Sequence, residues 1–596
     1  MSSEVTVHRD QGSVAGDQKF SAQPETRNPK KSVRMLTENW QINLRNYQHQ
    51  VDTVLAELKK NRIIERIWSK DYTVWKPDPA EISSRLGWLE SPRFMSNSIN
   101  RMQQLTDELR ADGFTHALLL GMGGSSLAPE VLRKTFGVPE GYLDLAVLDS
   151  TDPAYVLYHK KRLEPEKTLF VVSTKSGTTV ETFSFFKYFY NLVWDALGDR
   201  AGKHFVAITD PGSSLAGLAD RNSFRATFLN DSNIGGRYSA LSYFGLLPAA
   251  LIGLDVRKLL ERSMEMEDRC RKFNSGNMGL SLGVMIGMLA RAGRDKLTLI
   301  ISPEIASFGN WVEQLIAEST GKEGKGILPV VGEPVGSPDR YGNDRFFISL
   351  NLEWEGAYGP ALKALEDAGH PVVDIHLKDL YDLGGQFFLW EMATAVAGHI
   401  LQINPFDQPD VESSKKLSLR MVDEYIKKGT LPSQTSTLRY DGITVYGGPE
   451  ARTPGEALTA FIGQATPGTY VALQAYVQPT DETDNALLKL RARIRDRYNL
   501  ATTAGYGPRF LHSTGQLHKG DAGKGLFIQF TADDEKDVSI PDDVESSASS
   551  MSFGVLEMAQ AMGDRQALLD AGRQVVRFHL GQDISGGLKH LTEALG

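Results

Sequence analysis

Cysteine is almost absent from this chain of 596 residues, which contains only Cys270. A single cysteine excludes a disulfide within the chain and is typical of proteins that work in a reducing compartment. Long apolar runs are also missing, and no segment has the length and apolar character that crossing a bilayer needs. Residues 1–31 contain no apolar core like that of a signal peptide. We therefore expect a cytoplasmic protein with no role at a membrane.

Positive charge is not in excess either. The chain has 65 Lys and Arg residues against 74 Asp and Glu residues, which gives a formal net charge of −9. This balance argues against general binding to nucleic acid or to an anionic membrane surface. The spacing of His, Cys, Asp and Glu residues that is typical of a metal site is missing as well, so no metal is expected.

The remaining composition is that of a globular protein: 41% of the residues are hydrophobic and 23% are charged. The length suffices for several domains. Segments typical of strands and of helices alternate over 114–229 and again over 296–402, with a helical stretch at 238–292 between them. A third section, after about Gly429, contains a further strand–helix–strand unit. This alternation predicts an α/β protein whose parallel sheets are covered by helices on both faces.

The expected elements follow from apolar runs and helical spacing. The expected strands are 117–120, 143–148, 168–172, 205–208, 226–229, 296–301, 345–349, 372–375, 470–477 and 525–530. The expected helices are one or two within 40–68, then 180–197, 311–319, 361–368, 386–402, 483–497 and 553–562. The expected domains are a disordered arm (1–35), N-terminal helices with a first α/β domain (36–255), a second α/β domain (256–428), and a C-terminal α/β extension (429–596) that packs on or completes the second domain.

The most informative segment is a hydroxyl-rich turn, Ser173-Thr174-Lys175-Ser176-Gly177-Thr178-Thr179. It follows the expected strand 168–172 and precedes the expected helix 180–197. The unpaired N–H groups of a first helical turn, together with the helix dipole, favour an anion. The hydroxyls and the single lysine can surround a phosphate. The alternative is a helix cap rich in Ser and Thr that binds nothing.

A second loop, Gly121-Met122-Gly123-Gly124-Ser125-Ser126, ends the first strand of this region. Glycine lets backbone amides approach a ligand closely. The alternative is a dinucleotide site, because Asp149 ends the next strand as a ribose-binding acid would. Ser126 stands where the third glycine of that fingerprint belongs, and a dinucleotide does not require two phosphate loops. Both loops end parallel strands, where open α/β sheets bind ligands.

These two loops and three later stretches, in this order, resemble the sugar-isomerase (SIS) domain of the glucose-6-phosphate isomerase family. The later stretches are Ile234-Gly-Gly-Arg-Tyr-Ser239, Trp311-Val-Glu-Gln-Leu-Ile-Ala-Glu-Ser-Thr-Gly-Lys322 and Asn404-Pro-Phe-Asp-Gln-Pro-Asp-Val-Glu-Ser-Ser-Lys415. The resemblance spans roughly 121–415. It implies two SIS-type doubly wound subdomains, each an αβα sandwich, and an aldose–ketose isomerase that interconverts glucose 6-phosphate and fructose 6-phosphate. That chemistry moves protons through an enediol, so neither metal nor organic cofactor is expected.

The resemblance also implies a role for individual residues. Glu318 matches the base that moves a proton between C2 and C1, and Gln314 shares its helix face. Arg237 matches the cation that stabilises the enediolate. Lys415 matches a lysine near the ring oxygen, the alternative being a surface lysine. The residues implied to bind the substrate and its phosphate are Gly124, Ser125, Thr174, Lys175, Ser176, Thr179, Gly236, Gln314 and Gln408.

One expected residue is missing from its usual place. The family needs a histidine that assists opening of the pyranose ring, between the base motif and the final lysine motif. No matching motif stands there, but Phe510-Leu-His-Ser-Thr-Gly-Gln516 resembles it much later in the chain. We expect the third section to return His512 to the site. The alternative is a capping or core histidine. The C-terminal section also resembles the isomerase half of bacterial transaldolase–glucose-6-phosphate isomerase fusions, although no transaldolase-like lysine motif is found.

Three other functions keep parts of the same pattern. An isomerase that also accepts mannose 6-phosphate would share the base and both loops. A phosphosugar-binding protein without activity would need the loops but neither Glu318 nor Arg237, and both are present. A dinucleotide-dependent enzyme is the most distant alternative. The expected partner is a small sugar phosphate rather than nucleic acid or a membrane, and the resemblance implies a homodimer.

Overall fold

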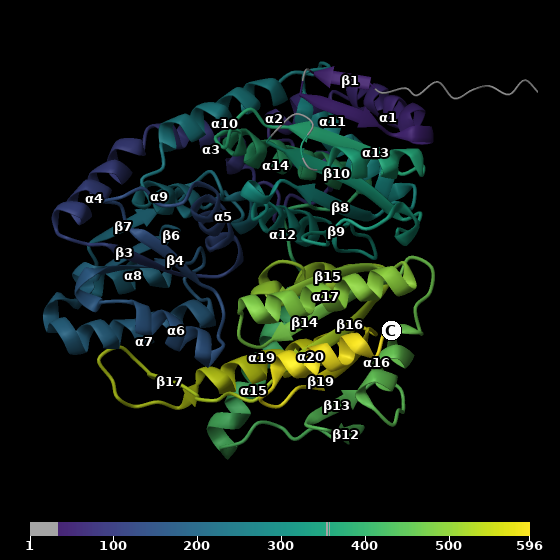
Figure 1. Ribbon diagram of the computed structural model, residues 1–596. Coiled ribbons are helices and arrows are strands. Elements are labelled where there is room, and N and C mark those ends of the chain that lie inside the picture. The colour runs from purple at the N-terminus through teal and green to yellow at the C-terminus, as the bar shows by residue number, and fades with distance from the viewer. Residues whose placement is uncertain (1–33, 38, 353–355, 357) are drawn as a thin grey trace, which may run out of the picture.

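Three large sheets organise the described residues, which are 34–37, 39–352, 356 and 358–596 of this computed structural model (Figure 1). The α/β class and the parallel sheets expected from the sequence are confirmed. The arm expected over 1–35 lies outside the described residues, apart from residues 34 and 35. Within the described part, no helix combines the length and the apolar character that crossing a membrane requires.

The first sheet is entirely parallel and has the order β4-β3-β5-β6-β7. Every residue of β5 is buried, as a strand with helices on both faces requires. The strand order reverses between β3 and β5, and ligands bind at such a point in open α/β sheets. The strands are β3 (His116–Gly121), β4 (Asp144–Leu148), β5 (Thr168–Ser173), β6 (Phe205–Thr209) and β7 (Ala226–Leu229), and the helices are α3 (Ser91–Ser96), α4 (Ile99–Ala111), α5 (Leu127–Phe136), α6 (Pro153–Arg162), α7 (Val180–Leu197), α8 (Ser214–Arg221) and α9 (Tyr243–Leu251).

The second sheet has the order β1-β2-β11-β10-β8-β9, with β8 to β11 parallel. Helix α14 is apolar all round and almost wholly buried, which places it in the core rather than on the surface. The strands are β1 (Arg34–Thr37), β2 (Trp40–Asn43), β8 (Lys296–Ile301), β9 (Leu328–Val330), β10 (Arg345–Asn351) and β11 (Val372–His376), and the helices are α10 (Val256–Cys270), α11 (Met278–Arg291), α12 (Phe308–Thr320), α13 (Gly359–Asp367) and α14 (Asp382–Leu401).

The start of the described chain differs from the sequence expectation of helix from Trp40 onward. Residues Trp40–Asn43 form β2, which pairs antiparallel with β11. Trp40 and Ile42 are both buried, as alternate residues of a strand can be. A segment of this length is too short for its sequence to distinguish a strand from a helix. Helices α1 (Gln48–Lys60) and α2 (Ile63–Trp68) come only after it. The segment before the first sheet therefore adds strands β1 and β2 to one edge of the second.

The third section forms a sheet of its own, in the order β12-β13-β19-β16-β14-β15. Four of its strands are parallel and the β12–β13 hairpin lies antiparallel at one edge. The expected strands 470–477 and 525–530 are β14 and β16. The strands are β12 (Leu438–Tyr440), β13 (Ile443–Gly447), β14 (Tyr470–Tyr476), β15 (Ala501–Tyr506), β16 (Gly525–Thr531) and β19 (Gln574–His579), and the helices are α15 (Val411–Lys428), α16 (Pro454–Ile462), α17 (Asp481–Tyr498), α18 (Gly515–Gly520), α19 (Phe553–Asp570) and α20 (Ile584–Glu593).

The third section contacts both other units (Figure 1). Phe553 at the start of α19 stacks on Phe185 of α7, with ring centroids 5.8 Å apart. Arg509 forms an ion pair with Glu130 of α5 and lies 3.3 Å from Asp149 at the end of β4. These contacts fix the segment 509–520 between the first two sheets.

Replacement of Arg509 by Leu tests whether its contacts with Glu130 and Asp149 hold the third section in place. The change leaves the carboxylate of Asp149 buried without its cation and leaves Glu130 paired with Lys134 alone, and we expect a loss on the order of 3 kcal/mol in the free energy of unfolding. Urea unfolding followed by tryptophan fluorescence measures the loss. The control Lys589→Ala removes a lysine from an exposed pair on α20 and should change stability by less than about 0.5 kcal/mol. Equal stability of the two variants would contradict this role of Arg509.

Candidate functional site

The glycine loop after β3 lies in backbone contact with two other segments. A Cβ on Gly123 would lie 2.8 Å from the carbonyl oxygen of His512, and one on Gly124 would lie 2.2 Å from that of Gly236. No side chain fits at such distances from backbone, so glycine is required at both positions. The neighbouring Ser125 is half-buried, and its carbonyl accepts a hydrogen bond from Ser173 Oγ at 3.1 Å. The absence of a side chain at these two positions thus allows the loop after β3 to lie against the turn at 236 and against the third section.

The hydroxyl loop, residues 174–179, connects β5 to α7. Thr174 Oγ1 and Thr179 Oγ1 are 3.0 Å apart, and Ser176 Oγ lies 2.9 Å from Thr178 Oγ1. Thr179 is the N-cap of α7, yet its side chain accepts no hydrogen bond from the helix amides. The N–H groups of the first turn and the loop hydroxyls therefore remain suited to an anion.

Lys175 is the one cation of the hydroxyl loop, and the structure pairs it with a carboxylate. Its ammonium group contacts Asp210 and donates to the carbonyl oxygen of Ser232 at 3.1 Å. The charge of Lys175 is therefore already compensated. The hydroxyls and amides of the loop are the more direct donors for a phosphate.

Helix α12 carries two of the expected residues on one face. Gln314 Nε2 donates to Glu318 Oε2 at 3.1 Å, as side chains four residues apart on a helix can. Arg237 Nη1 lies 3.3 Å from Glu318 Oε1. The side chain of Arg237 is only 2% exposed, whereas that of Glu318 is 14% exposed. The carboxylate therefore faces a small opening beside a fixed cation.

Arg237 is held on three sides. Its Nε donates to Ser319 Oγ at 2.8 Å, and its Nη2 donates to the carbonyl oxygens of Pro405 and Asp407 at 2.8 and 2.9 Å. Its Nη1 donates to Gln408 Oε1 at 2.9 Å. The guanidinium cannot turn without breaking several of these bonds, so its Nη1 edge stays directed at Glu318 and Gln408.

His512 lies between the two ends of the site. Its carbonyl oxygen accepts a hydrogen bond from Gln314 Nε2 at 2.7 Å, and its imidazole Nε2 lies 3.0 Å from Glu181 Oε1. Glu181 stands in the first turn of α7, directly after the hydroxyl loop. The structure thus brings His512 from the third section to the place between the base candidate and the phosphate loop.

Glu181 belongs to a short chain of polar contacts. Its Oε1 also accepts from Gln560 Nε2 at 2.7 Å, and Gln560 Oε1 accepts from Thr151 Oγ1 at 2.9 Å. Burial acts to raise the pKa of Glu181, but the charge and hydrogen bond of His512 outweigh it, so the pKa is lowered. Glu181 is therefore an ionised carboxylate that can hold the imidazole in one orientation.

A pocket of about 250 Å³ joins the hydroxyl loop to the third section. Its lining includes Ser176, Thr179, Glu181, His512 and Lys415. Lys415 is half exposed and forms an ion pair within its own helix, α15, with an N–O distance of 3.3 Å. The hydroxyl loop, His512 and Lys415 thus line the same pocket. The base candidate lies beyond His512, reached through Gln314.

The structure argues against a dinucleotide site, because the acid that would bind the ribose, Asp149, has partners within the protein. Asp149 Oδ2 accepts from Ser126 Oγ at 3.2 Å and lies 3.3 Å from Arg509 Nε. Asp149 is buried, and burial raises its pKa although Arg509 opposes the shift. The carboxylate that a ribose would need is occupied by contacts within the protein.

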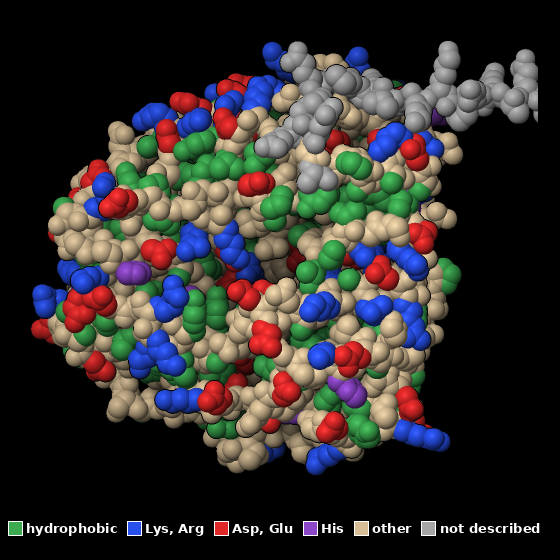
Figure 2. All heavy atoms as spheres, viewed as in Figure 1, with side chains coloured by type: hydrophobic (Ala, Val, Ile, Leu, Met, Phe, Trp, Pro, Cys, Tyr) green, Lys and Arg blue, Asp and Glu red, His purple; other side chains and the backbone are tan. Residues whose placement is uncertain are grey.

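Sequence reasoning missed three residues of this arrangement. Glu181 could have been noticed as an acidic residue in the first turn after an anion loop. Gln560 and Arg509 carry no signal of their own, because each acts only through a fold that brings the third section onto the first. Figure 2 shows the face of the molecule hollowed near its centre, between α5, α12 and β15, with acidic and basic side chains interspersed around it.

Comparisons with known proteins concern the amino-acid sequence and the fold of this chain. The family model described as phosphoglucose isomerase matches residues 94–326. A glucose-6-phosphate isomerase of Rubrobacter xylanophilus is 30% identical over 383 residues, which cover 56% of this chain and 88% of the relative. A glucose-6-phosphate isomerase of Carboxydothermus hydrogenoformans is 29% identical over 399 residues, covering 56% and 85%.

A solved structure extends the likeness to the fold. The crystal structure of a glucose-6-phosphate isomerase from Chlamydia trachomatis has a TM-score of 0.56 and 18% identity, covering 65% of this chain and 89% of the other. At that identity the likeness concerns the fold alone. The sequence match to the Rubrobacter protein carries the family assignment: this chain belongs to the phosphoglucose isomerase family.

Proposed function

We propose that this protein is a glucose-6-phosphate isomerase, which interconverts glucose 6-phosphate and fructose 6-phosphate. The observation that carries the proposal is the Glu318–Arg237 pair at 3.3 Å, which Gln314 connects to His512 in the lining of the pocket beside the hydroxyl loop. A protein that only bound a phosphosugar would need the pocket without a carboxylate and a guanidinium fixed beside it.

The hydroxyl loop supplies the anchoring end. The N–H groups at the start of α7 and the hydroxyls of Ser176 and Thr179 would bind the phosphate, in the way that helix N-termini bind anions. Binding the phosphate fixes the sugar, so that its reacting carbons meet the catalytic groups without a further loss of freedom.

His512 would open the pyranose ring. As the bond between C1 and the ring oxygen breaks, the imidazole donates a proton to that oxygen, and the hydroxyl on C1 gives up its own proton to water as the carbonyl forms. Glu181 holds Nε2 at 3.0 Å, which leaves Nδ1 as the atom that exchanges the proton with the substrate. Lys415, in the lining of the same pocket, would place its charge near the ring oxygen.

Glu318 would then move the proton between C2 and C1. Its carboxylate removes a proton from one carbon, and the electron pair passes to the carbonyl oxygen to form the enediolate. Arg237 stands where that negative charge develops, and a preorganised cation shielded from water stabilises charge as it forms. A proton also passes from the hydroxyl on C2 to the oxygen on C1, and return of the proton from Glu318 to the neighbouring carbon completes the isomerisation.

The oligomeric state is a proposal from the resemblance, and the location is a proposal from the composition of the chain. The homodimer and the cytoplasmic location stay predictions, and light scattering of the purified chain measures the first. Acceptance of mannose 6-phosphate is measured in the same assay as the main activity, by offering that epimer as substrate.

The most direct mutational test replaces Glu318 by Gln. The amide keeps the shape of the carboxylate but accepts no proton from carbon, so we expect kcat to fall at least about 1,000-fold with little change in KM. A coupled assay that oxidises newly formed glucose 6-phosphate measures it. The control Glu304→Gln alters an exposed carboxylate just before α12 and should retain full activity. Full activity of Glu318→Gln would refute the base, and an inactive wild-type protein would favour a phosphosugar-binding role.

Replacement of His512 by Ala separates ring opening from proton transfer. We expect a large loss with pyranose substrate and a much smaller loss with an aldose phosphate that cannot close a pyranose ring. Glu181→Gln should show the same pattern to a lesser degree, because it weakens the hold on the imidazole without removing it. The exposed His590 provides the control His590→Ala. Equal losses of His512→Ala on both substrates would contradict the role.

The phosphate loop is tested with Ser176→Ala and Thr179→Val. A hydrogen bond to a charged group contributes about 1.5–3 kcal/mol, so each change should raise KM about tenfold or more while kcat changes less. Steady-state kinetics measure both constants. Ser549→Ala, at an exposed serine of the third section, is the control. An unchanged KM in both loop variants would place the phosphate elsewhere.

A further inference from the structure

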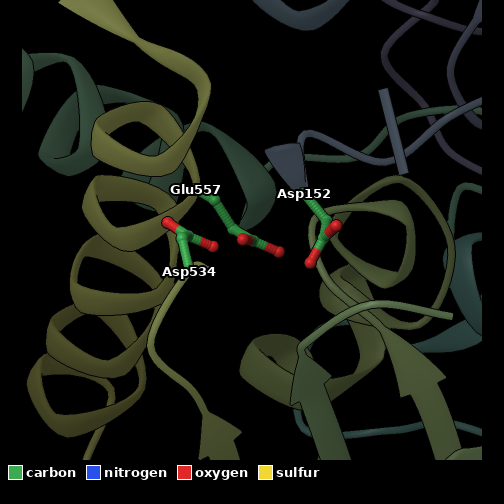
Figure 3. Close-up of side chains that lie close together, drawn as sticks. All are labelled: Asp152, Asp534 and Glu557. Carbon is green, nitrogen blue, oxygen red and sulfur yellow. The ribbon is translucent and has the colours of Figure 1, made fainter. Parts of the chain in front are cut away.

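A group of three carboxylates lies away from the candidate active site, at the contact between the first unit and the third section. Asp152 is the N-cap of α6, Asp534 follows β16, and Glu557 stands in the first turns of α19. One carboxylate oxygen from each lies within 4.8 Å of the others. Figure 3 shows the Glu557 side chain reaching between the other two.

The group lacks compensating charge. Among the described residues, no lysine, arginine or histidine appears among the groups that act on the charges of these three carboxylates. The charged neighbours that act on Asp534 are themselves acidic: Asp152, Asp537 and Asp533. Asp537 has hydrogen-bond partners of its own, because its Oδ1 accepts from the backbone N–H groups of Val538 and Gly554.

Glu557 is the unsatisfied member. The residue is 6% exposed, and its Oε1 is shielded from solvent with no hydrogen-bond partner. Burying a carboxylate oxygen without a donor or a cation is costly. Asp152 differs, because its Oδ1 accepts from Tyr155 N at 2.7 Å and caps the helix. The Glu557 carboxylate points into the group, where the missing partner would stand.

We infer that Asp152, Asp534 and Glu557 bind one divalent cation of the oxygen-seeking class, Ca²⁺ or Mg²⁺. Two oxygens that bind one Ca²⁺ at about 2.3–2.6 Å can be no more than about 5 Å apart, and the spacing of the three oxygens meets this limit. The group contains neither histidine nor cysteine, which favours these hard cations over zinc or copper. Water molecules would complete the coordination.

Protons are the competing way to compensate these charges. Burial raises the pKa of Asp152 to about 6, and burial together with the acidic neighbours raises that of Asp534 to about 7. A cation would keep all three groups ionised instead. Binding measured at neutral pH therefore distinguishes the two.

The cation would also connect the third section to the active site. Gln560 stands one helical turn after Glu557 on α19, and it contacts both Glu181 and Thr151. Thr151 directly precedes Asp152. An ion at the carboxylate group would cross-link α19 to the start of α6, and so hold the contacts that orient Glu181 beside His512.

Calorimetric titration of the full chain tests the site. The protein is treated with EDTA, exchanged into metal-free buffer at pH 7.5, and titrated with CaCl₂ or MgCl₂ alone. We expect saturable binding of one ion per chain for at least one of the two salts. The variants Glu557→Gln and Asp534→Asn should each weaken binding at least about tenfold. The control Asp570→Asn, at an exposed carboxylate near the end of the same helix, should bind as the wild type does.

Melting temperature gives a second measurement, which does not depend on isomerase activity. The cation should raise the melting temperature of the wild type and of Asp570→Asn but not that of Glu557→Gln. Without the cation, Glu557→Gln should melt no lower than the wild type, because it removes a buried charge from a repelling group. The site is refuted if neither salt binds saturably to the wild type, or if Glu557→Gln and Asp534→Asn both titrate as the wild type does.

Discussion

The contact of Arg509 with Glu130 and Asp149 is the interaction on which the candidate site depends. The Arg509 side chain, 23% exposed, exchanges much of its water for two fixed carboxylate partners, and the charges hold each other in place. Because Arg509 starts the short helix that ends at His512, its position sets that of the imidazole. The carbonyl of His512 then meets Gln314, and its ring meets Glu181. The third section thus contributes His512 to the candidate site.

Tight backbone contact is the second constraint. Gly123 and Gly124 have no room for a Cβ because His512 and Gly236 already lie against them. These contacts connect the glycine loop after β3, the turn at Gly236 and Arg237, and the third section. A shift in any one of these segments would therefore move the others. The same arrangement explains why Arg237 is so firmly held: its partners on 405–408 and on α12 approach from the second unit, while its own turn is fixed against the first.

Local pattern was enough for the first sheet and for strands β8, β10 and β11 of the second. Buried parallel strands are apolar runs, and the five strands of the first sheet all follow from that property. Glu318, Arg237 and the hydroxyl loop lie in continuous motifs, so the amino-acid sequence alone shows their likeness to a family. The pairing of β2 with β11 could not be predicted, because four residues are too few to separate a strand from a helix. Strands β15 and β19 carry Thr, Gly and Arg within short runs, and only their neighbours make them strands. Glu181, Gln560 and the carboxylate group around Glu557 depend on contacts between distant segments, which no spacing in the sequence records.

The central claim is that Glu318 transfers a proton through an enediol in a sugar phosphate held by the hydroxyl loop. Nuclear magnetic resonance of fructose 6-phosphate incubated with the protein in D₂O tests it most directly. The account predicts that glucose 6-phosphate appears with deuterium from the solvent at C2, because a proton carried by a carboxylate exchanges with water. Absence of glucose 6-phosphate, or its formation with the original hydrogen fully retained, would contradict the account.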